Sequence, residues 1–400
     1  MVAVAIVVAF PTNRRGTVEH VFGKTSRGRM IRVGPGCFRR FRIEKSVGRS
    51  PSGQRSLFLA TWNGGPHTVD GMTEIDVPQV ADPEIARLVR AEVEYRWPED
   101  ASDLDEVVRY GLVPFGKMMG PWLLIRSGLA VGGELAPMLP AAVAVECVQV
   151  GAMMHDDIVD EDAERRSKSA AYETFGHPTA IVGGDGLFFQ GFAALSDCGR
   201  AGVPESRVAR GLDVLARTGL RIGDAAVKEI RMGRTVCSTA TYRDMIKDKS
   251  GALLWMACGL GATLSGADEE SLDALHNYSN FLGIGYQIRD DLMAYDGTRA
   301  GKPNTSDIRN GRPTLPVLLA HRRASRNEKL LIEEILADTT SPVEQRYEAM
   351  RDLVRAHGAV DSAREMSRRY ARMAARALEA LPPGEHRDAL EELTATGRLV

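Results

Sequence analysis

From about residue 80 onward, apolar residues recur at positions i, i+3, i+4 and i+7 in long stretches that Gly and Pro separate. Strand-like alternation is scarce there, and no internal repeat suggests a solenoid. The pattern predicts an all-α fold, a single large helical bundle over roughly residues 80–400. The clearest helical stretches are 136–163, 181–198, 205–232, 250–265, 270–295 and 312–337.

Composition agrees with a helical, intracellular protein. Hydrophobic residues make up 44% of the chain but aromatic residues only 6%, which is typical of Ala/Leu-rich helices. The five cysteines are odd in number and form no CxxC pair, which favours reduced thiols in a cytoplasmic protein. No run approaches the roughly 18 apolar residues of a spanning helix. Residues 1–10 are apolar but lack the flanks of a signal peptide, so we expect no stable membrane insertion.

Residues 1–71 differ from the rest of the chain in charge and pattern. They hold 12 Lys/Arg against 3 Asp/Glu, whereas the remaining residues hold 39 against 50. No helical period is sustained in this basic segment. It is consistent with a disordered tail, with a targeting or docking segment, or with sequence upstream of a true start at Met72. It carries no recognition module, so we expect no nucleic-acid function.

Two apolar helical segments end in paired aspartates. The first ends in Asp156, Asp157 and Asp160; Asp156 and Asp160 are four residues apart and share one helix face. Carboxylates so close at a helix C-terminus repel one another and require a cation. One such cluster is equally consistent with a solvated acidic helix end. The second segment ends in Asp290 and Asp291, and two such ends facing each other predict a Mg²⁺ site for a diphosphate.

Basic residues follow each acidic cluster. Arg165 and Arg166 come directly after the first cluster, and a guanidinium suits phosphate oxygens. Lys302 lies in a polar loop after the second cluster, where it is well placed to close over a diphosphate. Both clusters therefore predict the same kind of ligand.

At this point the chain resembles the trans-isoprenyl diphosphate synthases, the polyprenyl synthetase family, which includes geranylgeranyl diphosphate synthases. Five blocks occur in the family's order across roughly residues 110–320. They are HDDIVDEDAERRS (155–167), GDGLFFQGF (184–192), KSGAL (249–253), GYQIRDD (285–291) and GKPNTSDIRNGRPTLP (301–316). The resemblance implies an isoprenoid synthase helical bundle with the active-site cavity between its helices.

The resemblance also implies a role for each matching residue. Mg²⁺ would be bound mainly by Asp156, Asp160 and Asp290, with Asp157 and Asp291 in support. Ionisation of the allylic diphosphate would depend on these aspartates together with Lys249 and Lys302. Contacts to the two substrates, the allylic diphosphate and isopentenyl diphosphate, are implied for Arg165, Ser250, Gln287, Lys249 and Lys302 (allylic) and for Lys117, Gln149 and Arg166 (isopentenyl).

Two departures from the family pattern matter. Where the family has Gly-Gly-Lys-Arg-x-Arg-Pro, Met118 and Gly120 replace both arginines, and Ala294 replaces the third aspartate of the second cluster. A lost charge-assisted contact at Gly120 is worth about 1.5–3 kcal/mol, or roughly 10- to 150-fold in affinity for isopentenyl diphosphate. Chain elongation is the function that the resemblance implies. The alternatives are transfer to a different acceptor, cyclisation as in a terpene synthase, and a role as the non-catalytic subunit of a heteromeric synthase.

Small residues precede the first aspartate cluster. In this family, bulky residues one helical turn before the cluster stop growth at C15, whereas here Gly151 and Ala152 stand there. The resemblance thus implies a product of C20 or longer, with Phe188 and Phe189 as a deeper floor of the cavity or as ordinary core. It also implies a homodimer, because residues 181–198 carry apolar side chains on more than one face.

Overall fold

The computed structural model describes residues 83–97, 102–296 and 305–396, together with five short strands between Val4 and Trp62. The chain divides into two compact units, Met1–Val77 and Pro78–Val400. Each unit is considered by itself.

The first unit contains only antiparallel pairings among its described strands. These are β1 (Val4–Val7), β2 (Val21–Lys24), β3 (Met30–Val33), β4 (Phe41–Glu44) and β5 (Phe58–Trp62). Strand β5 pairs with both β1 and β4, and β2 pairs with β3. The sequence pattern did not predict these strands, because four or five residues are too few to show a clear period of two. The interpretations of residues 1–71 remain predictions.

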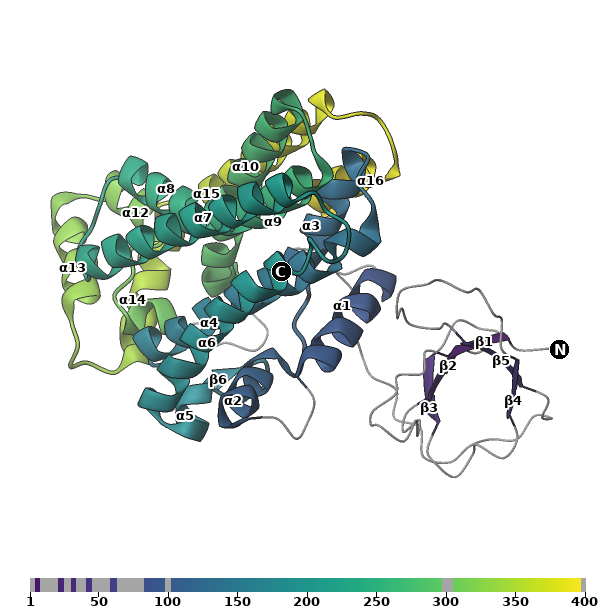
Figure 1. Ribbon diagram of the computed structural model, residues 1–400. Coiled ribbons are helices and arrows are strands. Elements are labelled where there is room, and N and C mark those ends of the chain that lie inside the picture. Colours follow the sequence, from purple (N-terminus) through teal and green to yellow (C-terminus); the bar gives the residue numbers. More distant parts are fainter. Residues whose placement is uncertain are drawn as a thin grey trace. The chain divides into compact units, whose positions relative to one another are not determined.

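The second unit is helical, which confirms the predicted all-α class (Figure 1). Its helices are α1 (Pro83–Arg96), α2 (Asp103–Leu112), α3 (Met119–Ala130), α4 (Leu135–Asp160), α5 (Ala171–Phe175), α6 (His177–Ser196), α7 (Glu205–Met232), α8 (Thr239–Ile246), α9 (Ala252–Ser265), α10 (Glu269–Asp296), α11 (Ser306–Arg309), α12 (Leu315–Arg323), α13 (Arg326–Ala337), α14 (Val343–Ala356), α15 (Ala359–Ala377) and α16 (Glu385–Thr396). A π-helical turn, Lys247–Gly251, joins α8 to α9, and a short hairpin, β6 (Glu164–Arg165) and β7 (Lys168–Ser169), follows α4.

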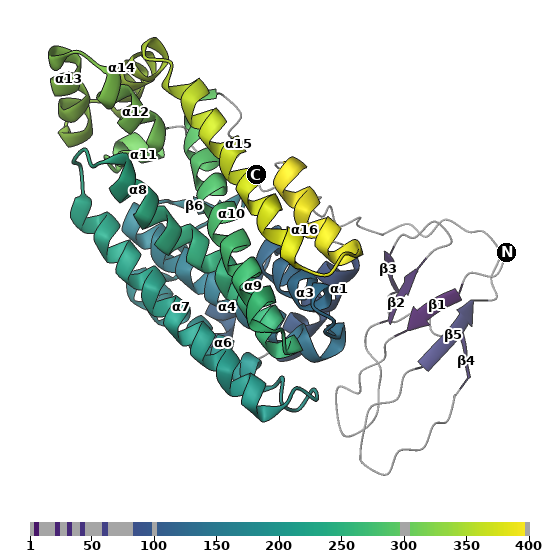
Figure 2. The same ribbon diagram turned by 90° about the horizontal axis from the view of Figure 1, so that it is seen from above.

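Two clusters of buried side chains form the core. The larger one brings α3, α4, α6 and α9 together through residues such as Leu123, Val143, Leu187 and Leu260. The smaller one joins α10 to α8, α12, α14 and α15. Helices α7, α9, α10 and α15 lie side by side in that order, as Figure 2 shows. The ends of α4 and α10 that carry the aspartates thus belong to one packed body.

The stretch 312–337, predicted as one helix, is two helices. Helix α12 ends at Arg323 and α13 begins at Arg326. The Ser325 hydroxyl accepts a hydrogen bond from the backbone N–H of Glu328, and the Glu328 carboxylate accepts one from the N–H of Ser325. This capping box starts a new helix, so the periodic apolar pattern continues across a break in the backbone.

Helix α4 is the one described helix that is long and apolar enough to cross a membrane. Within its most apolar window, 67% of the residues are buried inside the fold. Because most of this window is buried, α4 has the character of a core helix. The expectation that no run approaches the apolar length of a spanning helix is wrong for α4, because Glu146 and Gln149 interrupt the apolar run without lowering its mean hydropathy enough.

Candidate active site

The first aspartate cluster occupies the last turn of α4. Glu161 ends the helix with φ of 54°, in the left-handed region, and the N–H of Asp162 returns to the Asp157 carbonyl at 2.9 Å. The chain then enters the hairpin, where Arg166 and Ser167 both have positive φ between the paired strands. This two-residue turn folds the hairpin back along α4, so that Arg165 lies beside Asp157 in the last turn and Arg166 lies beside Glu146 in the middle of the helix.

Asp156 lies next to a lysine from the π-helical turn. The Lys249 Nζ is 3.8 Å from the Asp156 carboxylate and 2.6 Å from the carboxylate of Glu229 on α7. Burial acts to lower the pKa of Lys249, but Glu229 and Asp156 together raise it above its ordinary value. Lys249 is therefore a firmly charged cation beside the first aspartate.

Asp160 is buried and forms an ion pair with Arg312, which follows α11. Burial raises the pKa of Asp160, and Arg312 offsets part of this effect. The Arg312 Nε is also 3.8 Å from Glu229. Burial acts to raise the pKa of Glu229, but Lys249 and Arg312 lower it overall. Glu229 thus links the cations that face Asp156 and Asp160.

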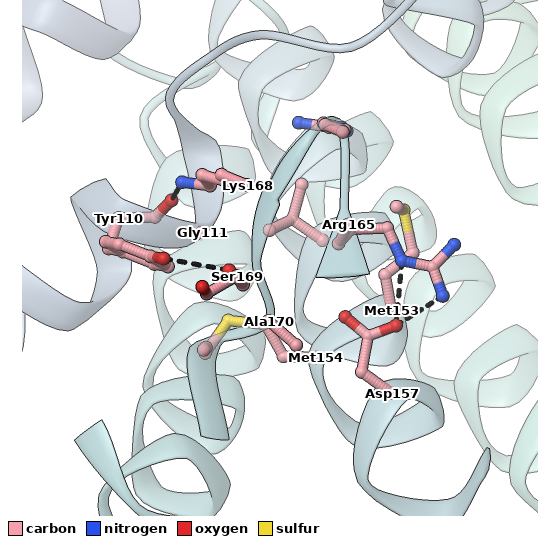
Figure 3. Close-up of a pocket in the computed structure, with 12 residues that line it drawn as sticks. Tyr110, Gly111, Met153, Met154, Asp157, Arg165, Lys168, Ser169 and Ala170 are labelled. Carbon is pink, nitrogen blue, oxygen red and sulfur yellow. Dashed lines mark hydrogen bonds and ion pairs between the residues drawn. The ribbon is translucent and has the colours of Figure 1, made fainter. Parts of the chain in front are cut away.

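Asp157 points away from this group and into the hairpin. It is buried, and its Oδ1 accepts a hydrogen bond from the Arg165 Nε at 2.7 Å, as Figure 3 shows. This contact satisfies Arg165, which was predicted to bind the allylic diphosphate. The supporting role of Asp157 in metal binding remains a prediction, and its observed contact fixes the hairpin.

Asp291, at the end of α10, is enclosed by neutral donors. Its Oδ2 accepts from the Tyr242 hydroxyl at 2.5 Å and from the backbone N–H of Leu315 at 2.9 Å. Its Oδ1 accepts from Gln287, whose own amide oxygen accepts from the Ser250 hydroxyl at 2.8 Å. Burial, with a smaller contribution from Asp307, raises the pKa of Asp291 to about 7. Ser250, Gln287 and Asp291 therefore form an internal chain, and their predicted roles toward substrate and metal remain predictions.

The hairpin also holds the segment that carries Lys117. The Lys168 Nζ donates to the carbonyls of Tyr110 and Val113, and the Arg166 guanidinium donates to the Pro114 carbonyl at 3.1 Å. A small cavity beneath the hairpin, whose lining includes Tyr110, Val150, Met154, Arg166 and Lys168, measures about 20 Å³ (Figure 3). It has room for about one water and none for a diphosphate.

The predicted acceptor residues lie around α3 and α4. Burial lowers the pKa of Lys117, and the nearby Asp290 opposes this effect. A Cβ atom at Gly120 would lie 2.9 Å from the Gln149 Oε1 and 2.7 Å from a methyl group of Val145. Arg166 is 3.5 Å from the buried Glu146. The side chain lost at Gly120 therefore leaves no open space, because α4 packs closely against this position.

The residues predicted to set product length lie in different surroundings. A Cβ atom at Gly151 would meet the Gly184 carbonyl at 2.9 Å and the Phe188 ring at 3.1 Å, so Gly151 allows α4 and α6 to pack closely. Ala152 is only partly buried. Phe189 is 75% exposed, so the expectation that it closes the floor of a cavity within this chain is wrong. It faces outward because it lies on the opposite side of α6 from Gly184.

Several residues of the site carried no predicted role. Arg312 lies within the block 301–316, but its contact with Asp160 depends on how α11 turns back toward α4. Glu229 and Tyr242 lie on helices without a local signal, because their partners are distant in sequence. Lys302 lies outside the described residues.

The donor set suits a hard cation that the substrate helps to bind. Among the described residues, no group of three or more His, Cys, Asp or Glu side chains is arranged to hold a metal by itself. Mg²⁺ usually takes one or two carboxylates and completes its shell with water and substrate phosphates. Asp156 and Asp160 offer such carboxylates, and the buried carboxylate of Asp160 pairs with Arg312. The residues present therefore fit this kind of ion.

Comparison with known proteins identifies the class. The sequence model of the family described as Polyprenyl synthetase matches residues 101–353, and the chain belongs to this family. It is 33% identical over 313 residues to a geranylgeranyl pyrophosphate synthase of Geoglobus acetivorans, covering 77% of this chain and 94% of the relative. It is 29% identical over 342 residues to a geranylfarnesyl diphosphate synthase of Natronomonas pharaonis, covering 80% and 97%. A solved geranylgeranyl pyrophosphate synthetase from Pyrococcus horikoshii shares the fold with a TM-score of 0.71 at 29% identity, covering 78% of this chain and 95% of that one.

Proposed function

We propose that this protein is a Mg²⁺-dependent prenyltransferase that condenses an allylic diphosphate with isopentenyl diphosphate to give an isoprenyl diphosphate of C20 or longer. The observation that carries the proposal is the convergence of Asp156, Asp160, Lys249 and Arg312 from distant parts of the chain. Family membership and the activities in the names of the relatives, which include geranylgeranyl and geranylfarnesyl products, support it.

The charges of the site suit departure of a diphosphate. Lys249 and Arg312 are fixed cations that would stabilise negative charge as the allylic C–O bond breaks. Asp156, Asp160 and Asp290 would hold Mg²⁺, which when bound neutralises the departing diphosphate. The apolar bundle would keep water from the allylic cation. Lys117, Gln149 and Arg166 are the proposed contacts to isopentenyl diphosphate.

The test incubates the protein with Mg²⁺ and farnesyl diphosphate, with and without isopentenyl diphosphate, and identifies the products by mass. We expect a longer diphosphate only when isopentenyl diphosphate is present. A hydrocarbon formed without isopentenyl diphosphate would overturn the proposal in favour of cyclisation.

A second candidate is ionisation of the allylic diphosphate with capture by another acceptor. Met118 and Gly120 favour it, because they remove two cations from the acceptor side, and Arg166 there is shared with Glu146. A prenylated product of a different nucleophile, with no extension of the diphosphate, would select this candidate.

We propose that the protein is a homodimer. Helix α6 exposes Val182, Phe189 and Phe192, an apolar surface of the kind that subunit interfaces cover. Light scattering during gel filtration tests the dimer, and Phe189→Asp should convert it to a monomer.

We also propose that the protein is cytoplasmic. Free thiols at Cys147, Cys198, Cys237 and Cys258 agree with a reducing compartment.

A further inference from the structure

Asp162 carries a buried carboxylate that was not among the predicted site residues. It connects two elements that each carry an arginine, the hairpin and α11. Asp162 follows α4 by two residues, and only 7% of its surface is exposed. The spacing of the aspartate motif does not include it. A buried, charged carboxylate is costly unless cations and hydrogen-bond donors surround it.

The partners of Asp162 come from opposite sides of the end of α4. Its Oδ1 accepts from the Arg309 Nη2 at 2.6 Å and from the Ser306 hydroxyl at 3.3 Å, both on α11. Its Oδ2 lies 3.7 Å from the Arg165 Nη2 on the hairpin. One carboxylate therefore joins the hairpin to α11.

The same arginines also contact the aspartate cluster. Arg165 donates to Asp157, and the Arg309 Nη2 donates to the Asp160 carbonyl at 3.0 Å. The Asp160 carbonyl is one of the last in α4 and lacks a partner within the helix. Losing Asp162 would leave each guanidinium with fewer restraints while the neighbouring carboxylates stay in place.

We propose that Asp162 is a positioning residue for the allylic diphosphate site, holding Arg165 and Arg309 beside the end of α4. The inference rests on the proposed function and adds a residue to it. It predicts a change in diphosphate binding opposite to the change that loss of a negative charge alone would cause. If Asp162 acted only as a negative charge, its removal would strengthen diphosphate binding. If it positions the arginines, its removal weakens binding.

The experiment compares Asp162→Asn with the wild-type full chain. Calorimetry with Mg²⁺ and an unreactive thiolo analogue of farnesyl diphosphate measures donor binding. We expect the Kd of the analogue to rise about tenfold, as for loss of one charge-assisted contact. The KM of isopentenyl diphosphate should stay within about twofold. Glu164→Gln is the matched control, because Glu164 is exposed on the same hairpin and loses the same charge.

A second variant keeps the inference testable if Asp162→Asn does not fold. Arg309→Lys keeps the charge but replaces the planar guanidinium, whose Nη2 donates to both Asp162 and the Asp160 carbonyl, with a shorter side chain, so it should also raise the Kd of the analogue several-fold. Combining it with Asp162→Asn should add little beyond the larger single effect. An unchanged or lower Kd in Asp162→Asn, or equal weakening of both substrates, would overturn the inference. Binding of the analogue needs no turnover, so a wild-type protein that binds it but forms no elongated product would refute the proposed function alone.

Discussion

The ends of α4 and α10 carry the same pair of adjacent aspartates but lie in different surroundings. At the end of α4, Asp157 and Asp160 contact arginines, and Asp156, whose side chain is 43% exposed, lies beside Lys249. At the end of α10, Asp291 is 4% exposed and accepts hydrogen bonds from neutral groups. The sequence motif is alike, whereas the electrostatic environment is not.

This difference separates two roles. Cations around the α4 cluster balance carboxylates that a metal and a diphosphate can share. The ion pair of Asp156 with Lys249 is partly exposed and therefore readily exchanged, whereas Asp157 and Asp160 are buried. Neutral donors around Asp291 instead join α10 to α8 and to the start of α12. Changes at the end of α4 should therefore affect catalysis most, and changes around Asp291 should affect stability most.

The largest effect is expected from Asp156→Ala. Loss of a principal Mg²⁺ ligand should remove several kcal/mol of transition-state stabilisation and lower kcat by about 10³-fold. The measurement is steady-state turnover of farnesyl and isopentenyl diphosphates. Glu161→Gln is the control, because Glu161 is exposed and adjacent to the cluster. Unchanged turnover in Asp156→Ala would refute the metal assignment.

A second effect is expected from Tyr242→Phe. This change removes one donor from the buried Asp291 carboxylate and should lower the free energy of unfolding by about 1.5–3 kcal/mol. Denaturant titration measures it, and kcat should change by less than about threefold. Tyr347→Phe is the control, because its hydroxyl donates to the Ala294 carbonyl on the same helix instead of to a carboxylate. A large loss of turnover with little loss of stability would remove the distinction between the two helix ends.

The sequence predicted the helical class and the placement of the aspartates because both depend on local patterns. Apolar periodicity located α4 and α10, and the spacing of Asp156 and Asp160 placed them on one face. The partners of these aspartates could not be predicted from the same patterns. Arg312, Glu229 and Tyr242 reach the site only through packing between helices that are distant in sequence.

Packing also adds what the sequence pattern could not show for glycine and phenylalanine. The predicted role of Gly151 in product length stays a prediction, and the structure adds that this glycine allows the close approach of α4 to α6. Phe188 and Phe189 are adjacent in sequence, but one packs against α4 and the other is exposed. A helical period assigns residues to faces, and only the packed fold shows which neighbour each face meets.

A smaller, selective effect is expected from Gln149→Ala, which tests how far the catalytic role of α4 extends from its end. Losing one proposed hydrogen bond to isopentenyl diphosphate should raise the KM of that substrate roughly two- to twelvefold. The KM of the allylic diphosphate should stay unchanged in the same kinetic experiment. Gln190→Ala on α6 is the control for loss of a partly buried amide. An equal rise in both KM values would mean that Gln149 supports the helix and not the acceptor.

The last effect, on stability alone, is expected at Lys168, which lies near the α4 cluster yet, like Asp291, is held by neutral groups. Burial, with a contribution from Arg166, lowers the pKa of Lys168 from 10.5 to about 8. Between these values the unfolded chain binds more protons than the folded one, so stability should rise with pH from about 8 to 10.5. Below pH 8 both states are protonated and this dependence disappears. The difference in free energy of unfolding between wild type and Lys168→Met measures it across that range. If the difference stayed flat or fell with increasing pH, Lys168 would behave as a solvated ion and would belong with the exchangeable charges at the end of α4.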